Sequence, residues 1–182
     1  MKICALLLLA LPVLAAERTL DLTPENTKIE WTLSDVLHTV HGTFQLKSGS
    51  VHFDSDTGKA GGEVVVNVAS GKSGSETRDK RMHANVLESP KYPDAVFTPD
   101  RIDGTVAMNG ASQVKIHGNF RIHGADHEMS MDAQINATAE KMTAVLTFAI
   151  PYVAWGMKDP STFILKVGKS VDMKIEATGA LH

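Results

Sequence analysis

Cysteine is nearly absent from this chain, since Cys4 is the only one among 182 residues. It lies in an N-terminal stretch that we expect to be removed, which excludes a disulfide, a thiolate metal site and a cysteine nucleophile from the mature protein. Positive charge is also scarce: the formal net charge is −3, and it becomes −4 once Lys2 is lost. Nucleic-acid binding by counterion release needs the opposite sign. With 21% charged and 43% hydrophobic residues, the chain is not intrinsically disordered.

Motifs of the common enzyme classes are missing as well. The sequence has no G-x-S-x-G, no H-E-x-x-H, no Walker loop and no G-x-G-x-x-G. We therefore expect a protein that is not an enzyme and that has no catalytic residues and no obligatory cofactor.

The N-terminus has the organisation of a secretory signal. A short basic start at Met1-Lys2 precedes an apolar stretch from Ile3 to Leu14, and small residues at 15–16 provide a cleavage site. The stretch is too short for a bilayer core, which needs about 20 apolar residues. The sequence predicts a signal peptide at 1–16, a single domain at 17–182 and a periplasmic, secreted protein.

Strict alternation of apolar and polar residues dominates the rest of the chain, as in strands with one buried face. The alternating runs lie at 28–34, 44–46, 51–53, 64–68, 114–122, 128–135, 142–150 and 171–176, and turn residues separate them, with one turn predicted at 47–49. One stretch differs: Ser73 and Glu76 have capping-box spacing and predict a short helix near 76–84. The prediction is an all-β protein, and long antiparallel strands favour a closed barrel over a sandwich because closure removes exposed edges.

Several segments resemble one known family. The segment from Ser73 to Ile102 has a polar helix start followed by Y-P-x-x-x-F at 92–97, and 41–44 contains a G-x-F strand. Residues 117–124 resemble a G-x-L-T-x-x-G strand, with Phe120 where Leu is usual and Arg121 where Thr is usual, and 155–167 resembles a closing loop. Together these segments, spread over residues 19–179, resemble the YceI-like family.

This resemblance implies an extended lipocalin-like antiparallel barrel of about eight strands. In that family the apolar tunnel holds a polyisoprenoid chain, such as a quinone tail or a polyprenyl lipid. It also implies periplasmic location and no catalytic residues. A bound isoprenoid lipid or quinone is therefore the expected partner, and the chain is compatible with transient membrane contact and with a homodimer.

The inward-facing apolar residues are the candidate lining of such a tunnel, because an isoprene chain needs apolar walls and flexible methionines suit it. The candidates are Phe44, Phe53, Val66, Phe97, Ile116, Phe120, Met129, Met131, Leu146 and Phe148. Spacing alone leaves open that the same residues pack on one another as a filled core.

Polar residues offer two further candidate sites. Arg78 and Asp79 at the helix start are candidates for a rim that meets a ligand head group, or for a helix that pairs its own charges. His117, His123 and His127 would form a metal-binding face if they met across a hairpin, but no carboxylate spacing completes such a site, and we predict no metal. The alternative to lipid binding is thus a ligand-free barrel acting through its surface, with a His-rich face for a metal or a partner.

Overall fold

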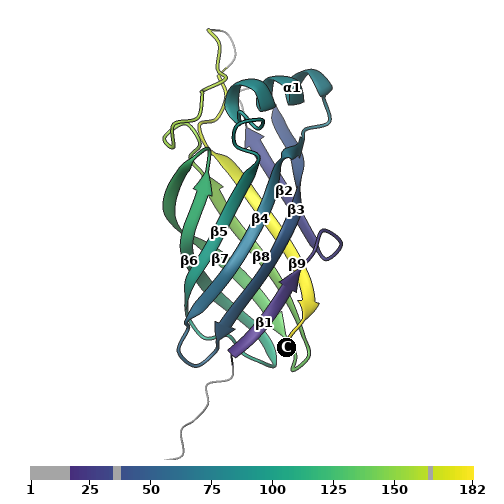
Figure 1. Cartoon of the computed structure of the whole chain (residues 1–182), viewed down its shortest axis with the longest axis vertical. Coiled ribbons are helices and arrows are strands. Elements are labelled where there is room, and N and C mark those ends of the chain that lie inside the picture. Colours follow the sequence, from purple (N-terminus) through teal and green to yellow (C-terminus); the bar gives the residue numbers. More distant parts are fainter. Residues whose placement is uncertain (1–16, 35–37, 164–165) are drawn as a thin grey trace, which may run out of the picture.

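A computed structural model describes residues 17–34, 38–163 and 166–182. The predicted signal peptide at 1–16 lies outside the described residues. In the described part of the chain, nine strands and one helical connection follow one another (Figure 1). They are β1 (Glu17–Leu22), β2 (Thr27–Ser34), β3 (Thr39–Asp54), β4 (Ala60–Lys72), α1 (Glu76–Arg81), a π-helical turn η1 (Met82–Val86), β5 (Asp94–Asp103), β6 (Gly110–Ile122), β7 (Ala125–Ala137), β8 (Lys141–Ile150) and β9 (Val171–Ala180).

The sheet closes on itself. Its strands follow the order β1-β3-β2-β9-β8-β7-β6-β5-β4, every neighbouring pair is antiparallel, and β4 also pairs with β3. The result is the predicted antiparallel barrel of eight strands, with β1 as an extra strand. Closure satisfies the backbone hydrogen bonds that an open sheet would expose at its edges.

The extra strand β1 continues the line of β2. β1 pairs with residues 49–54 of β3, and β2 pairs with residues 39–44 of the same long strand. A turn divides them, in which the Asn26 side chain accepts a hydrogen bond from the Thr23 backbone N–H at 2.7 Å. An Asn side chain that hydrogen-bonds to the backbone a few residues away is typical of turns. Pro24, between Thr23 and Asn26, has no N–H to donate to a neighbouring strand, which also ends the ladder here.

The helical connection α1–η1 lies at one end of the barrel, beside the loop between β8 and β9 (Figure 1). Its N-cap is Ser75, which makes no side-chain capping bond. The capping box predicted at Ser73 and Glu76 is therefore wrong. Ser73 instead uses its backbone N–H and its hydroxyl to bind Asp79.

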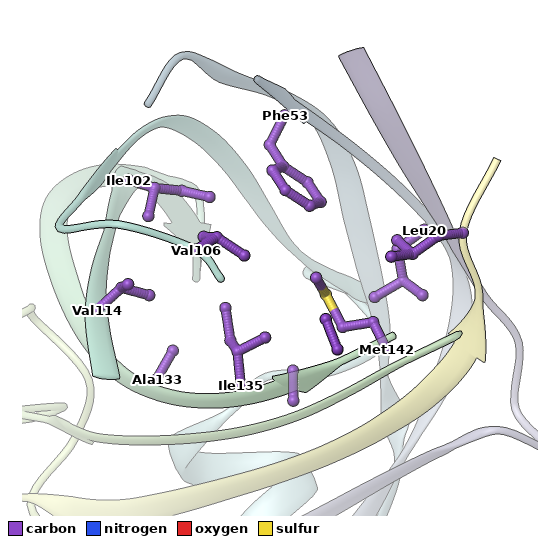
Figure 2. Close-up of a cluster of buried hydrophobic side chains, with 11 residues drawn as sticks. Leu20, Phe53, Ile102, Val106, Val114, Ala133, Ile135 and Met142 are labelled. Carbon is purple, nitrogen blue, oxygen red and sulfur yellow. The ribbon is translucent and has the colours of Figure 1, made fainter. Parts of the chain in front are cut away.

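The opposite end of the barrel is filled. Eleven buried apolar residues form what we call the lower cluster, and Figure 2 shows labelled members converging from several strands. They are Leu20, Phe53, Ile102, Val106, Val114, Ala133, Ile135, Ala137, Met142, Ala144 and Leu181. Val106 belongs to the connection between β5 and β6 and is only 4% exposed, so this connection helps to close the end of the barrel.

A second apolar cluster, the upper cluster, lines the half of the barrel nearer α1. Its buried members include Ile29, Trp31, Phe120, Ile150 and Met173. In the described residues no helix has the length and apolar character needed to cross a membrane.

Candidate functional site: an apolar cavity with a polar mouth

The upper half of the barrel is hollow. It contains a cavity of about 680 Å³, within the range of sites that enclose a small molecule. Its wall comes from inward-facing side chains of the strands and from Tyr152, which follows β8. The wall residues are Ile29, Trp31, Leu33, Phe44, Val66, Val68, Ala95, Phe120, Ile122, Phe148, Ile150, Tyr152, Val171, Met173 and Ile175. No member of the lower cluster is in this wall, so the cavity ends where the filled half begins.

The mouth of the cavity lies between α1–η1 and the loop after β8. From the helical side it is lined by Ser75, Thr77, Arg78, Arg81, Met82, Asn85, Val86 and Leu87, and from the loop by Met157, Lys158, Asp159, Pro160, Ser161 and Val167. An apolar interior thus meets water through a ring that carries three cations and one carboxylate.

Arg78 is held in place at this mouth. Its Nε donates to the Ser73 hydroxyl and its Nη2 to the Ser73 backbone carbonyl, both at 2.7 Å. Asp79 accepts from the Ser73 backbone N–H at 2.9 Å and from its hydroxyl. Ser73 is buried, and the three residues fix the start of α1 to the end of β4.

The carboxylate of Asp159 is engaged by its own loop. It accepts a hydrogen bond from the Ser161 backbone N–H at 2.9 Å, and Ser161 lowers the pKa of Asp159. Lys169 and Lys166 lower it further by their charge. Asp159 is therefore ionised at neutral pH and already partnered, which leaves the three cations to dominate the mouth.

Two histidines anchor the helical connection to the barrel. His83 bridges the Gly71 carbonyl, 2.9 Å from its Nε2, and the Ser89 hydroxyl, 3.1 Å from its Nδ1. His123, in the β6–β7 turn, lies 2.7 Å from Glu88 through its Nε2, and its ring packs 4.4 Å from that of Tyr92. The segment that covers the cavity is thus attached on both sides.

The comparisons with known proteins agree with this architecture. The family model of the YceI-like domain matches residues 20–179, which is most of the chain. The chain belongs to the YceI-like family.

Solved structures show how widely this YceI-like fold is shared. A polyisoprenoid binding domain from Saccharophagus degradans, implicated in plant cell wall breakdown, has a TM-score of 0.69 at 14% identity, covering 89% of this chain and 98% of its own. BcnA of Burkholderia cenocepacia has a TM-score of 0.70 at 15% identity, covering 84% and 96%. The YceI protein of Campylobacter jejuni has a TM-score of 0.66 at 21% identity, covering 79% and 86%. At these identities the likeness shows the fold alone, and no curated protein matches the sequence significantly.

The ten predicted lining residues divide into three groups in this YceI-like barrel. Four lie in the cavity wall, namely Phe44, Val66, Phe120 and Phe148. Phe53 belongs to the lower cluster, and Ile116 and Leu146 pack against it. Phe97 and Met129 pack against the upper cluster without reaching the wall, and Met131 is buried at 3% exposure outside the wall. Alternation predicts which face a residue is on, but it does not predict depth along the barrel axis.

Of the two residues predicted to form the rim, one lines the mouth. Arg78 lines the mouth, but Asp79 is not among the lining residues because it binds Ser73. Sequence reasoning missed Trp31, Met173 and Lys158 as parts of the site. Trp31 and Met173 alternate with polar neighbours, so the sequence did indicate that they face inward. Lys158 lines the mouth because the loop after β8 folds back toward α1, which the sequence pattern does not predict.

The three histidines considered for a metal face do not come together. His127 has inward parity on β7 and stacks on Trp155, with ring centroids 4.0 Å apart and planes at 5°. His117 lies 2.8 Å from an Asp100 carboxylate oxygen, and His123 lies at the Glu88 contact. The contact across the hairpin that such a face would require does not form, and among the described residues no three metal-ligating side chains gather.

Proposed function

We propose that this protein is an exported, non-enzymatic binding protein that sequesters or shuttles an isoprenoid lipid, either a quinone or a polyprenyl chain. The observation that carries the proposal is the one-ended apolar cavity of about 680 Å³. The description of the Saccharophagus degradans neighbour as a polyisoprenoid binding domain supports it. The fold-level likeness and the shape of the cavity thus favour the same class of ligand.

The wall suits a chain of methylenes, methyls and alkenes. It consists of aliphatic and aromatic side chains, with Met173 as an adaptable thioether, and the polar groups are concentrated at the mouth. Burial is worth about 0.8 kcal/mol per CH₂ relative to water. Because a membrane also keeps the chain out of water, exchange between bilayer and cavity has a net free energy near zero, as a reversible carrier requires.

The polar end of the ligand belongs at the mouth. There Arg78, Arg81 and Lys158 offer donors to an oxygen-rich head group, such as a quinone carbonyl or a phosphate.

Export rests on the predicted signal at 1–16, and N-terminal sequencing of periplasmic protein tests it: a chain beginning at Ala16 or Glu17 supports export.

Organic extraction of the purified protein followed by mass spectrometry tests the ligand. We expect a long-chain isoprenoid in the extract, and we expect delipidated protein to take up prenols or quinones from liposomes. A clean extract together with no uptake would contradict the proposal and favour the surface-acting alternative.

A pair of variants locates the binding in the cavity. Val66→Trp places an indole in the cavity wall, and we expect at least about a tenfold loss of uptake because the guest and the new ring compete for the same volume. Val145→Trp makes the same change on β8 at a position of outward parity, outside the cavity wall, and should leave uptake unchanged.

A further inference from the structure

The end of the barrel that carries the cavity mouth also carries an exposed aromatic side chain. Phe163 is 98% exposed and is the one exposed large hydrophobic residue in the described part of the chain. It lies in the loop between β8 and β9, the loop that supplies Met157 to Ser161 to the mouth. A single exposed apolar side chain is common on protein surfaces, so the charges at the same end of the molecule decide whether it marks an interaction site.

Positive charge is concentrated at the same end of the barrel as Phe163. The two segments that flank the mouth, 76–86 and 151–170, contain six lysines and arginines against three carboxylates, while the whole chain is net negative. The six are Arg78, Lys80, Arg81, Lys158, Lys166 and Lys169, and all of them are exposed. This end of the molecule is therefore an electropositive face on an acidic protein.

Two of the three carboxylates already accept hydrogen bonds from other groups of the protein. Asp79 binds Ser73, and Asp159 accepts from the Ser161 backbone N–H. The neighbouring β6–β7 hairpin adds an Arg121–Asp126 ion pair at 2.9 Å, which is neutral as a unit. The third carboxylate, Glu76, is exposed, and the six cations outnumber the three carboxylates at this end of the barrel.

We propose that this face, defined by Phe163 and the six cations, docks the protein transiently on an anionic phospholipid bilayer, with Phe163 entering the interface. The inference rests on the proposed function, since a lipid carrier must collect its ligand from a membrane. Lys and Arg near an anionic surface and an apolar side chain in the acyl boundary are the two components of reversible interfacial binding. Because the cavity opens between α1 and this loop, docking brings its mouth against the lipid.

Vesicle co-sedimentation of the ligand-free protein tests the docking. We expect binding to vesicles of phosphatidylcholine mixed with phosphatidylglycerol, weak binding to phosphatidylcholine alone, and loss of binding at high salt because exposed charges are screened. Phe163→Ser should weaken binding by about tenfold, given the value of burying one large apolar side chain. Lys166→Gln with Lys169→Gln should weaken it by about 25-fold, at about fivefold for each cation.

The matched control is Lys59→Gln with Lys141→Gln, two exposed lysines near the turns at the filled end of the barrel. This double variant should bind anionic vesicles like the unchanged protein. Equal weakening by the control pair, or equal binding to neutral and anionic vesicles, would overturn the docking proposal.

A second measurement separates the docking surface from the lipid site. Loading of a prenol from detergent, where no bilayer is present, should be unchanged in Phe163→Ser and in the Lys166/Lys169 variant, because none of these residues lines the cavity. If the unchanged protein fails to load from detergent, the proposed function fails. If loading succeeds while anionic vesicles bind no better than neutral ones, only the docking proposal fails.

Discussion

One glycine determines whether Trp31 can lie in the cavity wall. Gly42 on β3 is the register partner of Trp31 on β2. A Cβ at position 42 would lie 2.2 Å from the Trp31 ring atoms Cε2 and Cζ2, and 2.3 Å from the Lys72 backbone oxygen. The Lys72 carbonyl belongs to the backbone of the neighbouring strand β4. The clash with a Cβ at position 42 can therefore be relieved only if the strands of the sheet shift. The glycine that forms part of the G-x-F strand thus leaves room for an indole.

Gly42→Ala should therefore destabilise the protein and disturb the upper half of the barrel. Overpacking of this kind costs about 1–3 kcal/mol, which corresponds to a fall in Tm of several degrees. Thermal unfolding followed by circular dichroism measures it, and prenol uptake should fall in parallel because Trp31 is displaced into the cavity.

Gly49→Ala, on the same strand, is the control for that substitution. Its Cβ would lie 3.1 Å from the Leu22 Cβ and 3.2 Å from the Leu22 Cδ1, a much milder overlap than at position 42, which a shift of a few tenths of an ångström relieves. We expect a much smaller change in Tm at position 49 and normal uptake. Equal Tm losses at the two positions would contradict the steric explanation.

At the scale of elements, the connection between β8 and β9 is held by a buried tyrosine. The Tyr152 hydroxyl donates to the Gly168 carbonyl at 2.7 Å, which ties the beginning of the connection to its end. Burial raises the pKa of Tyr152 to about 12, with a further contribution from the charge of Asp159. Its phenol is therefore neutral in the folded protein over the whole physiological range.

This pKa predicts a loss of stability at alkaline pH. An unfolded tyrosine ionises near its ordinary pKa of 10.0, whereas the folded one holds its proton up to about 12. Between these values the unfolded state binds fewer protons, so the free energy of unfolding decreases as pH rises. Denaturant unfolding at a series of pH values should show this fall, which begins near pH 10.

Tyr152→Phe tests the assignment. It removes the hydrogen bond to Gly168, at a cost of about 1 kcal/mol at neutral pH, and it also removes this group's part of the alkaline slope. Tyr92→Phe changes the only other tyrosine of the sequence and serves as the control. An alkaline slope that survives in Tyr152→Phe would show that other groups cause it.

Most elements were predictable from the sequence because one buried face produces a period of two. The runs at 114–122, 128–135 and 142–150 fall within β6, β7 and β8. β5 was missed, since Pro99 interrupts it and the ladder shifts register between Pro99 and Arg101. The capping box failed for a local reason: the Ser73 hydroxyl binds Asp79 and Arg78, contacts that need the end of β4 and the first turn of α1 to meet.

At the scale of the whole molecule, the barrel is filled at one end and hollow at the other. The turn predicted at 47–49 is wrong, because β3 continues through it with a shift of register between Leu46 and Ser48. That shift places both Phe44 and Phe53 on the inner face, and sequence patterning could not divide such inward residues between the two halves. The two side chains lie at different depths along the barrel axis. Phe53 is 3% exposed in the lower cluster, whereas Phe44 lies in the cavity wall. The division makes the protein a closed-ended container, which limits the length of chain that it can enclose.

The volume sets that limit. A water molecule occupies roughly 30 Å³ of liquid, and we take the same volume for each carbon atom with its hydrogens. The cavity of about 680 Å³ then holds on the order of twenty carbon atoms, or about four isoprene units. Affinity should therefore rise from geraniol to farnesol to geranylgeraniol as each unit is removed from water. It should then level off for a longer polyprenol, whose extra units remain outside the mouth. Competition against a fluorescent prenol measures the series.

Phe53→Ala provides the decisive variant for this limit. It removes a large side chain from the lower cluster, at a cost of about 3–5 kcal/mol in stability. If the lower cluster is what ends the cavity, the variant should still bind geranylgeraniol and should shift the plateau toward longer chains. An affinity that keeps rising with chain length in the unchanged protein would instead mean that the lower cluster opens on binding, and the closed-ended container would be the wrong description.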